Sequence, residues 1–414
     1  MPEAEISADR AKLLSVMRHR LIAALAALAC LAVTTAALAR PAIVLDVDSG
    51  RVLYAREATR EWYPASLTKL MTMYVTLRAV RAGRVSLDTP LVYTAEAAAQ
   101  KPSKLGLPVG TVITIDNAIK IMIVRSANDL AVTLAQGVGG SIEAFVTEMN
   151  ATAARLGMQQ THFVNPNGWW EPGQVTSARD MAILARALLR EFPEEAYIFK
   201  IRSLKLGKRV IRGHNPLLGR FLGADGMKTG FTCPSGLNLV ASASRGDRHL
   251  IAVVMGHTSG KDRTEEAAEL LEQGFGTLTF WRSGQTAESL PPQPGEPPNM
   301  RQMACGGKKQ PVDEDAEEAL PDPQTMGGLI SAFAEEKRPV LLDKAPPSAP
   351  VNVFLGPNPA APAALPAVPG PAYAGNLTSP PAALTASDEG LVPAPVMPMP
   401  APRPAGLKSA KASK

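Results

Sequence analysis

Apolar and polar residues alternate with a period of two in two parts of this chain, one near residue 45 and one near residue 240. The first part reads PAIVLDVDSGRVLYARE and predicts a β-hairpin whose turn falls at Asp48, Ser49 and Gly50. The second part contains GMKTGFT, LNLVASAS and HLIAVVMG, separated by the turn-like CPSG and RGDR. The pattern therefore predicts two early strands and three late ones.

Between these two parts the period lengthens to that of an α-helix. Apolar residues three or four positions apart predict helices near residues 116–137, 141–156 and 178–190, with others over 66–81 and 262–275. Ser141 and Ser177 stand where helix N-caps are expected, and Ser177 with Asp180 resembles a capping box. The middle of the chain is therefore expected to be mostly helical.

This order of elements predicts an α+β fold. An antiparallel sheet would form where the first two strands meet the last three, with helices on its faces and an all-α insertion between them. The pattern ends near residue 283. Of the 37 prolines, 26 lie in residues 284–414, so we predict a folded domain over 40–283 followed by a Pro/Ala-rich, low-complexity tail that is disordered.

Residues 1–39 have the three parts of a secretory signal. Basic residues in MRHR precede an apolar stretch that starts at Leu21, and Ala37, Leu38 and Ala39 form a small-residue cleavage site. An uncleaved membrane anchor is the alternative, because the apolar stretch approaches the ~20 residues that span a bilayer. We expect cleavage after Ala39 and export to the periplasm or cell envelope.

Composition narrows the possible partners. Residues 40–283 carry 29 basic and 22 acidic side chains, a positive balance that favours anionic substrates or surfaces. Aromatic residues make up 5% of the chain and form no dense basic-aromatic stripe, so no nucleic-acid partner is predicted. No H-E-x-x-H and no paired-cysteine spacing occurs, and we expect neither a metal nor a cofactor.

Two cysteines, Cys233 and Cys305, follow the signal segment. Because Cys305 falls in the predicted tail, the pair implies no disulfide framework, even in an oxidising compartment. Cys233 is interpreted as a small, half-buried apolar residue.

The chain carries three short polar motifs, each once: SLTK at 66–69, SAN at 126–128 and KTG at 228–230. The first opens a predicted helix, the second lies between helical segments and the third lies on a strand. Taken singly each is weak, because helix caps and solvated lysines would explain them. Together and in this order they indicate an active-site serine with a lysine partner.

With the surrounding YPASLTKLMT, RSANDLAVTLA and DGMKTGFTCPSGLNLVASA, residues 41–280 resemble the serine-type D-alanyl-D-alanine carboxypeptidases, the low-molecular-weight penicillin-binding proteins. The stretch NPNGWWEPGQVTSARDMA also resembles one that in this family commonly ends in Ser-Ala-Arg-Asp. The resemblance implies a β-lactamase/transpeptidase-like fold. It also implies a peptidoglycan pentapeptide as substrate, an acyl-enzyme intermediate and β-lactams as covalent inhibitors.

A serine hydroxyl needs a neighbouring base to act as a nucleophile. Ser66 and Lys69 lie one helical turn apart, and Lys69 can accept the proton if burial, the helix N-terminus and a second cation at Lys228 lower its pKa. None of the five histidines has a spacing to Ser66 that suggests a dyad. Ser126 is predicted to relay a proton to the leaving amine, and Asn128 to orient Lys69 and bind the acyl-side amide of the substrate.

The other predicted site residues surround the scissile bond. Gly230 would leave space for the strand lysine and the substrate, and the Thr229 hydroxyl would bind the terminal carboxylate. Backbone N–H groups of Ser66 and Phe231 would stabilise the oxyanion. Arg263 matches the arginine that this family places after the last strand, where it would pair with the substrate carboxylate.

Three other functions stay open. A D,D-endopeptidase or a class A-like β-lactamase would use the same three motifs, although the setting of Glu171 fits a carboxypeptidase better than a deacylating glutamate. The non-enzymatic alternative is an inactive envelope scaffold with a partner-binding tail. The final GLKSAKASK is basic but has no apolar face, so membrane association by that route is not predicted.

Overall fold

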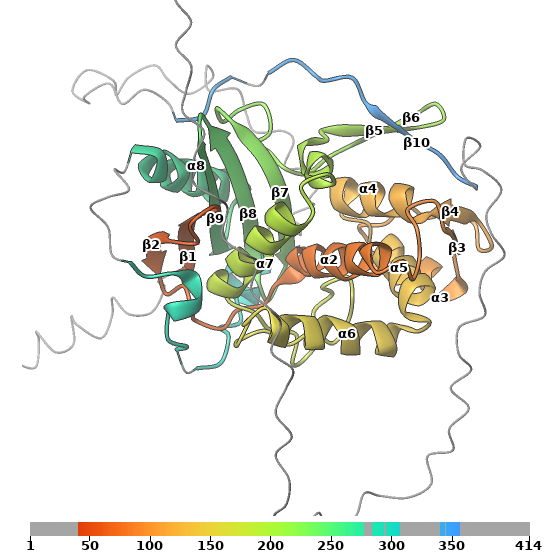
Figure 1. Cartoon of the computed structure of the whole chain (residues 1–414), viewed down its shortest axis with the longest axis horizontal. Coiled ribbons are helices and arrows are strands. Elements are labelled where there is room, and N and C mark those ends of the chain that lie inside the picture. The colour runs from red at the N-terminus through yellow and green to blue at the C-terminus, as the bar shows by residue number, and fades with distance from the viewer. Residues whose placement is uncertain (1–39, 277–283, 294, 307–339, 344, 357–414) are drawn as a thin grey trace, which may run out of the picture. The chain divides into compact units, whose positions relative to one another are not determined.

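The computed structural model describes residues 40–276, 284–293, 295–306, 340–343 and 345–356, so the expected signal segment lies outside the described residues. Its main sheet confirms the predicted antiparallel α+β fold (Figure 1). The first two strands meet the last three because β1 pairs with β9, with Val44 opposite Ala252. The strand order is β2-β1-β9-β8-β7, with β1 Ala42–Asp46, β2 Val52–Arg56, β7 Ala224–Thr232, β8 Gly236–Arg245 and β9 Arg248–His257.

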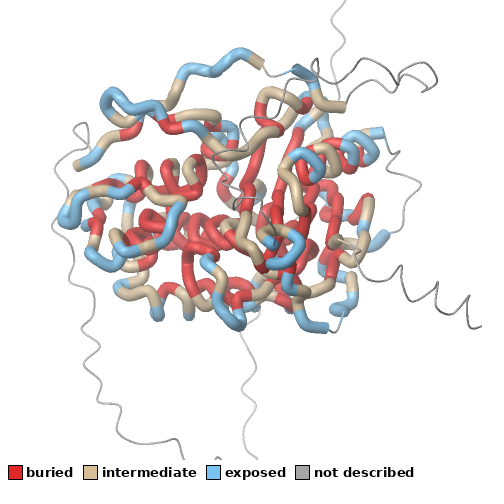
Figure 2. The backbone as a smooth tube through the Cα atoms, turned by 180° about the vertical axis from the view of Figure 1, so that it is seen from behind, coloured by how far each residue is buried: buried red, intermediate tan, exposed pale blue. Residues whose placement is uncertain are grey.

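Both faces of this sheet are covered. Successive side chains of β1 point to opposite faces, so Ile43 enters one hydrophobic core and Val44 enters the other. Helix α7 (Ala178–Glu191) packs on the first face, and α8 (Gly260–Gly276) packs on the second. The central strands are therefore buried along most of their length (Figure 2), which explains their nearly continuous apolar sequence.

The helical part is built around α2 (Thr68–Arg81), which is buried over most of its length. The predicted helical segment 116–137 is divided at the SAN motif, which was expected between helical segments, because Ser126 adopts a left-handed conformation and ends the first helix. Within the described residues no one helix is both long and apolar enough for a bilayer span, whereas α5 and α6, bent by 88°, pass that test as a pair. The remaining elements are β3 Pro90–Val92, α3 Ala95–Ala98, β4 Val112–Thr114, α4 Ile115–Arg125, α5 Asn128–Gly139 and α6 Ile142–Arg155.

Both predicted helix caps are present. Ser141 Oγ accepts a hydrogen bond from the Ala144 N–H at 3.1 Å, at the start of α6. Ser177 Oγ accepts one from the Asp180 N–H at 3.1 Å, at the start of α7. These local signals therefore set the first residues of both helices.

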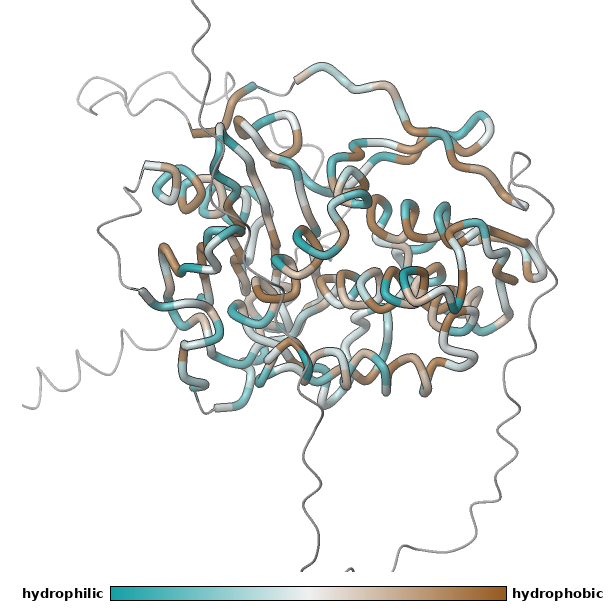
Figure 3. Tube along the Cα trace, viewed as in Figure 1, coloured by the Kyte–Doolittle hydropathy of each residue, from teal (hydrophilic) through white to brown (hydrophobic). Residues whose placement is uncertain are grey.

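Residues 284–306 belong to the predicted tail, yet the described ones lie against the domain. They form η5 (Ala287–Ser289) and α9 (Arg301–Cys305). They are mostly hydrophilic (Figure 3), and they attach largely through backbone hydrogen bonds, such as the one from the Val52 N–H to the Gln285 carbonyl at 3.0 Å. Because backbone hydrogen bonds do not depend on hydrophobic side chains, the pattern of hydrophobic residues could not predict these contacts.

A second stretch of the predicted tail also contacts the domain. The strand β10 (Val351–Val353) pairs in parallel with β5 (Ser203–Leu206), which forms a hairpin with β6 (Arg209–Arg212). Further along, the Gly356 N–H donates to the Val112 carbonyl at 2.7 Å. The domain boundary at residue 283 stays a prediction, and the rest of the expected tail falls outside the described residues.

The expectation that no disulfide forms is wrong. Cys233 and Cys305 are joined by a disulfide with a Cα–Cα distance of 5.6 Å. The sequence argument placed Cys305 in a disordered tail, whereas α9 brings it beside the turn between β7 and β8. Disulfides persist mainly in oxidising compartments, which agrees with the predicted export of the chain.

Candidate active site

Ser66 lies in η2 (Ala65–Leu67), the short turn that leads into α2. The turn is held in place by Asn238, which is fully buried on β8. Its Nδ2 donates to the Tyr63 carbonyl at 2.9 Å and to the Pro64 carbonyl at 3.3 Å. A strand distant in the sequence therefore fixes the position of the predicted nucleophile.

The amine of Lys69 is 0% exposed and touches three oxygens. Its Nζ donates to Ser66 Oγ at 2.9 Å, to Asn128 Oδ1 at 2.7 Å and to the Asn167 carbonyl at 2.6 Å. The last two oxygens only accept, so they hold two N–H bonds of Lys69 whether the amine is charged or neutral. The remaining site on the Lys69 nitrogen faces the serine hydroxyl. That site holds a proton when the amine is charged and a lone pair when it is neutral.

The second motif reaches the same place from the junction of α4 and α5. Ser126 is fully buried and has φ 59° and ψ 31°, a left-handed conformation that is uncommon for residues other than glycine. Lys228, which is 2% exposed, donates through Nζ to Ser126 Oγ at 2.9 Å and to the Thr229 carbonyl at 2.8 Å. Asn128 Nδ2 donates to the Lys101 carbonyl at 2.9 Å, and this bond orients the amide oxygen toward the α2 lysine.

The third motif meets the nucleophile through Gly230 on β7. A Cβ at this position would lie 3.0 Å from the Ser66 nitrogen, 3.1 Å from the Leu67 nitrogen and 3.2 Å from the Pro64 carbonyl oxygen. The expected reason for glycine was space shared by Lys228 and the substrate. The structure adds a second reason, because the strand itself packs against the backbone of the serine turn.

Substituting Gly230→Ala is therefore expected to slow acylation of the serine by about tenfold or more. The added carbon meets backbone atoms on three sides, so the strand and the serine turn must move apart by some tenths of an ångström, and small displacements of reacting groups are costly. The measurement is the rate of covalent labelling by a fluorescent penicillin. Gly276→Ala is the matched control, because a Cβ there meets no atom within 4 Å. Wild-type labelling by the Gly230 variant would contradict this account.

Three further predicted site residues lie around the same strand and the following helix. Thr229 is 2% exposed, and its Oγ1 makes no hydrogen bond with the described residues. Phe231 is half-buried and lies opposite Leu237 of β8. Arg263 is 0% exposed, in the first turn of α8. Their roles toward a substrate stay predictions.

The start of β7 is anchored by a buried carboxylate. Asp225 accepts hydrogen bonds from Ser242 Oγ and Ser244 Oγ, each at 2.6 Å, and lies 3.3 Å from His249 Nε2. Burial acts to raise the pKa of Asp225, but the hydrogen bonds from the histidine and both serines outweigh it and lower the pKa. The charged form therefore ties the start of β7 to β8 and β9, three residues before Lys228.

The sequence did not single out Asn167, although its carbonyl accepts a hydrogen bond from the Lys69 amine. The next residue, Gly168, has φ 83°, and a Cβ there would lie 1.9 Å from the Ala65 carbonyl oxygen. Thr72 Oγ1 also donates to the carbonyl before Asn167, at 2.5 Å. The loop thus packs tightly under the first turns of α2. Its stretch resembled a family segment, but nothing in the residue types indicated a backbone contact.

A small pocket lies beside Lys228 and Thr229. Within the part of the chain that the structure describes, no group of three or more His, Cys, Asp or Glu side chains is arranged to hold a metal ion. The pocket walls are mostly apolar, with two further polar residues, and comprise Ile123, Val124, Ile198, Phe199, Ile201, Gly213, His214, Asn215, Leu218 and Met227.

An antiparallel sheet with a helical insertion, and a half-buried serine hydrogen-bonded to a buried lysine beside its edge strand, define an active-site-serine protein of the penicillin-binding class. A family model described as D-alanyl-D-alanine carboxypeptidase, peptidase S11, matches residues 30–259, which is more than half of the chain. The chain belongs to this family.

Curated relatives agree with this assignment. D-alanyl-D-alanine carboxypeptidase DacC of Escherichia coli is 39% identical over 244 residues, which cover 57% of this chain and 61% of that protein. DacA of Haemophilus influenzae is 35% identical over 257 residues, which cover 61% of this chain and 65% of that protein. The chain therefore matches less than two thirds of the length of these relatives.

Solved structures show the same fold. Penicillin binding protein 6B from Escherichia coli has a TM-score of 0.55 at 37% identity, covering 57% of this chain and 77% of that one. Penicillin-binding protein D2 from Listeria monocytogenes, in its cefotaxime-bound form, has a TM-score of 0.53 at 31% identity, covering 57% of this chain and 97% of that one.

Proposed function

We propose that this protein is a serine-type D,D-carboxypeptidase, which removes the terminal D-alanine from peptidoglycan stem peptides through an acyl-enzyme on Ser66. One observation carries the proposal: the buried amine of Lys69 lies 2.9 Å from Ser66 Oγ while fixed acceptors hold its other N–H groups. Family membership and relatives that are themselves named as carboxypeptidases support it.

Acylation begins with Lys69 as an uncharged amine. Burial favours this form because it penalises the ammonium, and the lone pair then faces the Ser66 hydroxyl. Lys69 accepts the hydroxyl proton as Oγ attacks the carbonyl carbon of the penultimate D-alanine. The backbone N–H groups of Ser66 and of Phe231, the residue after Gly230, would stabilise the oxyanion; the close packing of Gly230 on the serine turn supports this pairing.

The carbon–nitrogen bond breaks when the leaving D-alanine nitrogen gains a proton. Ser126 Oγ, which accepts a hydrogen bond from Lys228 Nζ, can give its proton to that nitrogen and regain one from Lys69. In the second half of the cycle a water molecule attacks the ester and Lys69 takes its proton. Lys69 then gives that proton to Ser66 Oγ as the ester bond breaks, so the shortened peptide leaves, the serine hydroxyl re-forms and Lys69 is again an uncharged amine.

The substrate ends in a carboxylate, and the site offers a hydroxyl and cations for it. Thr229 Oγ1 has no hydrogen-bond partner among the described residues and is therefore available to a ligand. Lys228 lies beside it on the same strand. Arg263 would add a bidentate contact if the first turn of α8 opens, since its guanidinium is buried.

β-Lactams are expected to acylate Ser66, as cyclic amides that present a reactive carbonyl to the same nucleophile. Structures of penicillin-binding protein D2 from Listeria monocytogenes in cefotaxime-bound and ampicillin-bound forms support this. Peptidoglycan stem peptides lie outside the cytoplasmic membrane, so the proposed activity places the protein in the periplasm or cell envelope, which fits the predicted signal segment.

The β-lactamase alternative is less well supported. It needs a glutamate that activates the deacylating water, and Glu171 is exposed to solvent. Next to Lys69 the same loop presents the backbone carbonyl of Asn167. A D,D-endopeptidase would use the same Ser–Lys site. The two activities would therefore be distinguished by the length of the peptide that the protein prefers to cleave.

The test is D-alanine release from a peptide ending in D-Ala-D-Ala, combined with mass spectrometry of the protein after penicillin treatment. We expect one D-alanine per peptide and one stable adduct on the Ser66 peptide. A protein that turns over nitrocefin rapidly and keeps no adduct would be a β-lactamase. A folded protein with neither adduct nor D-alanine release would contradict the proposal.

A further inference from the structure

The disulfide connects the active-site strand to a segment beyond the matched family region. Cys233 follows β7 directly and lies two residues after Phe231, whose N–H is the proposed oxyanion donor. Cys305 is the last residue of α9, at a sequence separation of 72. The match to the family model ends at residue 259, so α9 and its cysteine lie outside the matched residues.

A second bond holds the same turn to α9. The Met300 N–H, just before the helix, donates to the Pro234 carbonyl at 2.9 Å. Met300 is 3% exposed and packs in the main hydrophobic core. The turn between β7 and β8 is therefore tied to both ends of α9, through Pro234 at one and Cys233 at the other.

The opposite attachment of the turn leads to the nucleophile. Trp62 Nε1 donates to the Ser235 carbonyl at 2.9 Å, and Trp62 lies four residues before Ser66. Within the turn, Ser235 Oγ accepts a hydrogen bond from the Thr232 N–H at 2.9 Å. The turn thus connects the backbone leading to Ser66 with α9.

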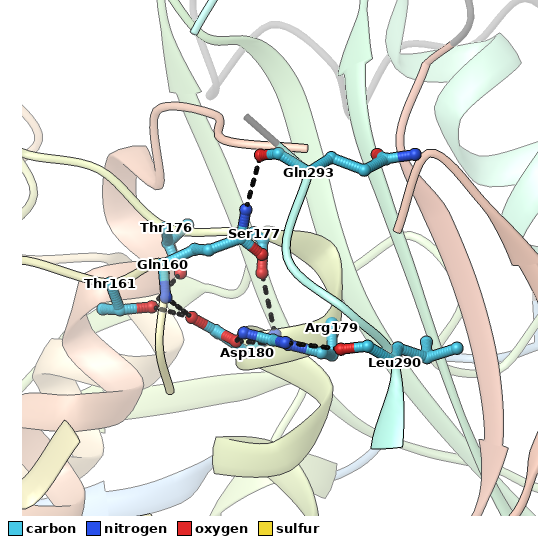
Figure 4. A network of polar contacts seen from close by, with 8 residues as sticks. All are labelled: Gln160, Thr161, Thr176, Ser177, Arg179, Asp180, Leu290 and Gln293. Carbon is cyan, nitrogen blue, oxygen red and sulfur yellow. Dashed lines mark hydrogen bonds and ion pairs between the residues drawn. The ribbon is translucent and has the colours of Figure 1, made fainter. Parts of the chain in front are cut away.

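The segment that carries α9 has its own anchors on the domain. Arg179 Nη1 donates to the Leu290 carbonyl at 2.9 Å, and Gln160 Nε2 donates to the Gln293 carbonyl at 3.1 Å (Figure 4). Arg179 is 1% exposed and paired with Asp180, so it is rigidly held. These bonds fix the segment before α9 independently of the disulfide, which makes α9 a firm support for the turn.

We propose that the Cys233–Cys305 disulfide, with α9, is a positioning element for the reaction: it holds the β7–β8 turn so that the Phe231 N–H stays directed at the oxyanion. The inference rests on the proposed function. Neither cysteine touches the reacting atoms, and both act through the backbone of the turn. Preorganised donors act only at a narrow range of positions, so releasing the turn weakens stabilisation of the oxyanion more than binding of the substrate.

The test compares the oxidised full chain with the same protein reduced by dithiothreitol and with the double variant Cys233→Ser/Cys305→Ser. We expect the reduced protein and the variant to be acylated by a fluorescent penicillin about tenfold more slowly. This effect is smaller than the ~10²–10³-fold loss of rate that follows when an oxyanion donor is removed outright. For a D-Ala-D-Ala peptide, kcat should fall by a similar factor while KM stays within about twofold.

The measurements are made well below the melting temperature, with circular dichroism to confirm folding and thiol titration to confirm two additional thiols. Reoxidation should restore the rate, and dithiothreitol should leave the double variant unaffected. A disulfide that only stabilises the fold would lower the melting temperature without changing the acylation rate of folded protein, and that result would overturn the inference. Unfolding of both the reduced protein and the variant would overturn it too, because the disulfide would then support the whole domain.

These outcomes are distinguishable from failure of the proposed function. If the oxidised protein forms no adduct on Ser66, the proposed function fails. If it forms the adduct and the reduced protein does so at the same rate, only the role of the disulfide fails.

Discussion

The variant Ser66→Ala is expected to release no D-alanine and to form no covalent adduct with a fluorescent penicillin. The proposed cycle begins with attack by Ser66 Oγ, and its later steps act on the acyl-enzyme that this attack forms. The amine of Lys69 cannot replace the serine, because Lys69 is 0% exposed whereas Ser66 is half-buried. The measurements are D-alanine release and gel fluorescence after labelling.

This variant should remain folded. Lys69 keeps its bonds to Asn128 Oδ1 and the Asn167 carbonyl, so the loss is one hydrogen bond, worth about 1 kcal/mol of the free energy of unfolding. Ser86→Ala, at an exposed serine, is the matched control and should label like the wild type. If the Ser66 variant were labelled at another serine, Ser66 would not be the nucleophile and the proposed mechanism would be wrong.

The variant Lys69→Met is expected to lower the rate of acylation by roughly 10²–10⁴-fold, the usual contribution of a positioned general base. Methionine is of similar length and fills the same buried space, so the serine turn should stay in place while its base is lost. The measurement is the second-order rate constant for penicillin labelling, and the adduct should still form slowly on Ser66.

Stability should fall as well in this variant. The substitution leaves Asn128 Oδ1 and the Asn167 carbonyl buried without their donor, at about 1–3 kcal/mol for each unsatisfied group. Lys261→Met is the control, because that side chain is 64% exposed. It should leave the labelling rate unchanged and alter the free energy of unfolding by no more than about 0.5 kcal/mol. A destabilised Lys69 variant that still labels at the wild-type rate would assign the lysine a structural role alone.

The order of elements could be predicted from local patterns, and the same patterns singled out the candidate site residues. A period of two identified all five strands of the main sheet, and capping serines marked the starts of α6 and α7. The three motifs could be recognised because each places polar groups at a spacing fixed by the backbone, as with Ser66 and Lys69 one helical turn apart. The structure brings their side chains within hydrogen-bond distance, although their catalytic roles still await the experiments above.

Other parts of the site had no local signal. The Asn167 carbonyl is a backbone group, and any residue type supplies one, so its contact with Lys69 could not be read from sequence. Gly230 was recognised, but the atoms that require it belong to the distant serine turn. The sequence analysis did not single out Asn238, whose hydrogen bonds to the carbonyls of Tyr63 and Pro64 depend on the fold.

The sequence by itself determined which elements form and which side chains carry the proposed chemistry, because hydrophobic period, capping and motif spacing are properties of neighbouring residues. Only the tertiary structure decided which described segments after residue 283 contact the domain and what supports its active-site strand. The disulfide between Cys233 and Cys305 and the bond from Arg179 to the Leu290 carbonyl join residues far apart in the chain. These bonds form only when the folded backbone brings the two residues close together. A hydrophilic, proline-rich segment has no hydrophobic period or motif that would predict this proximity.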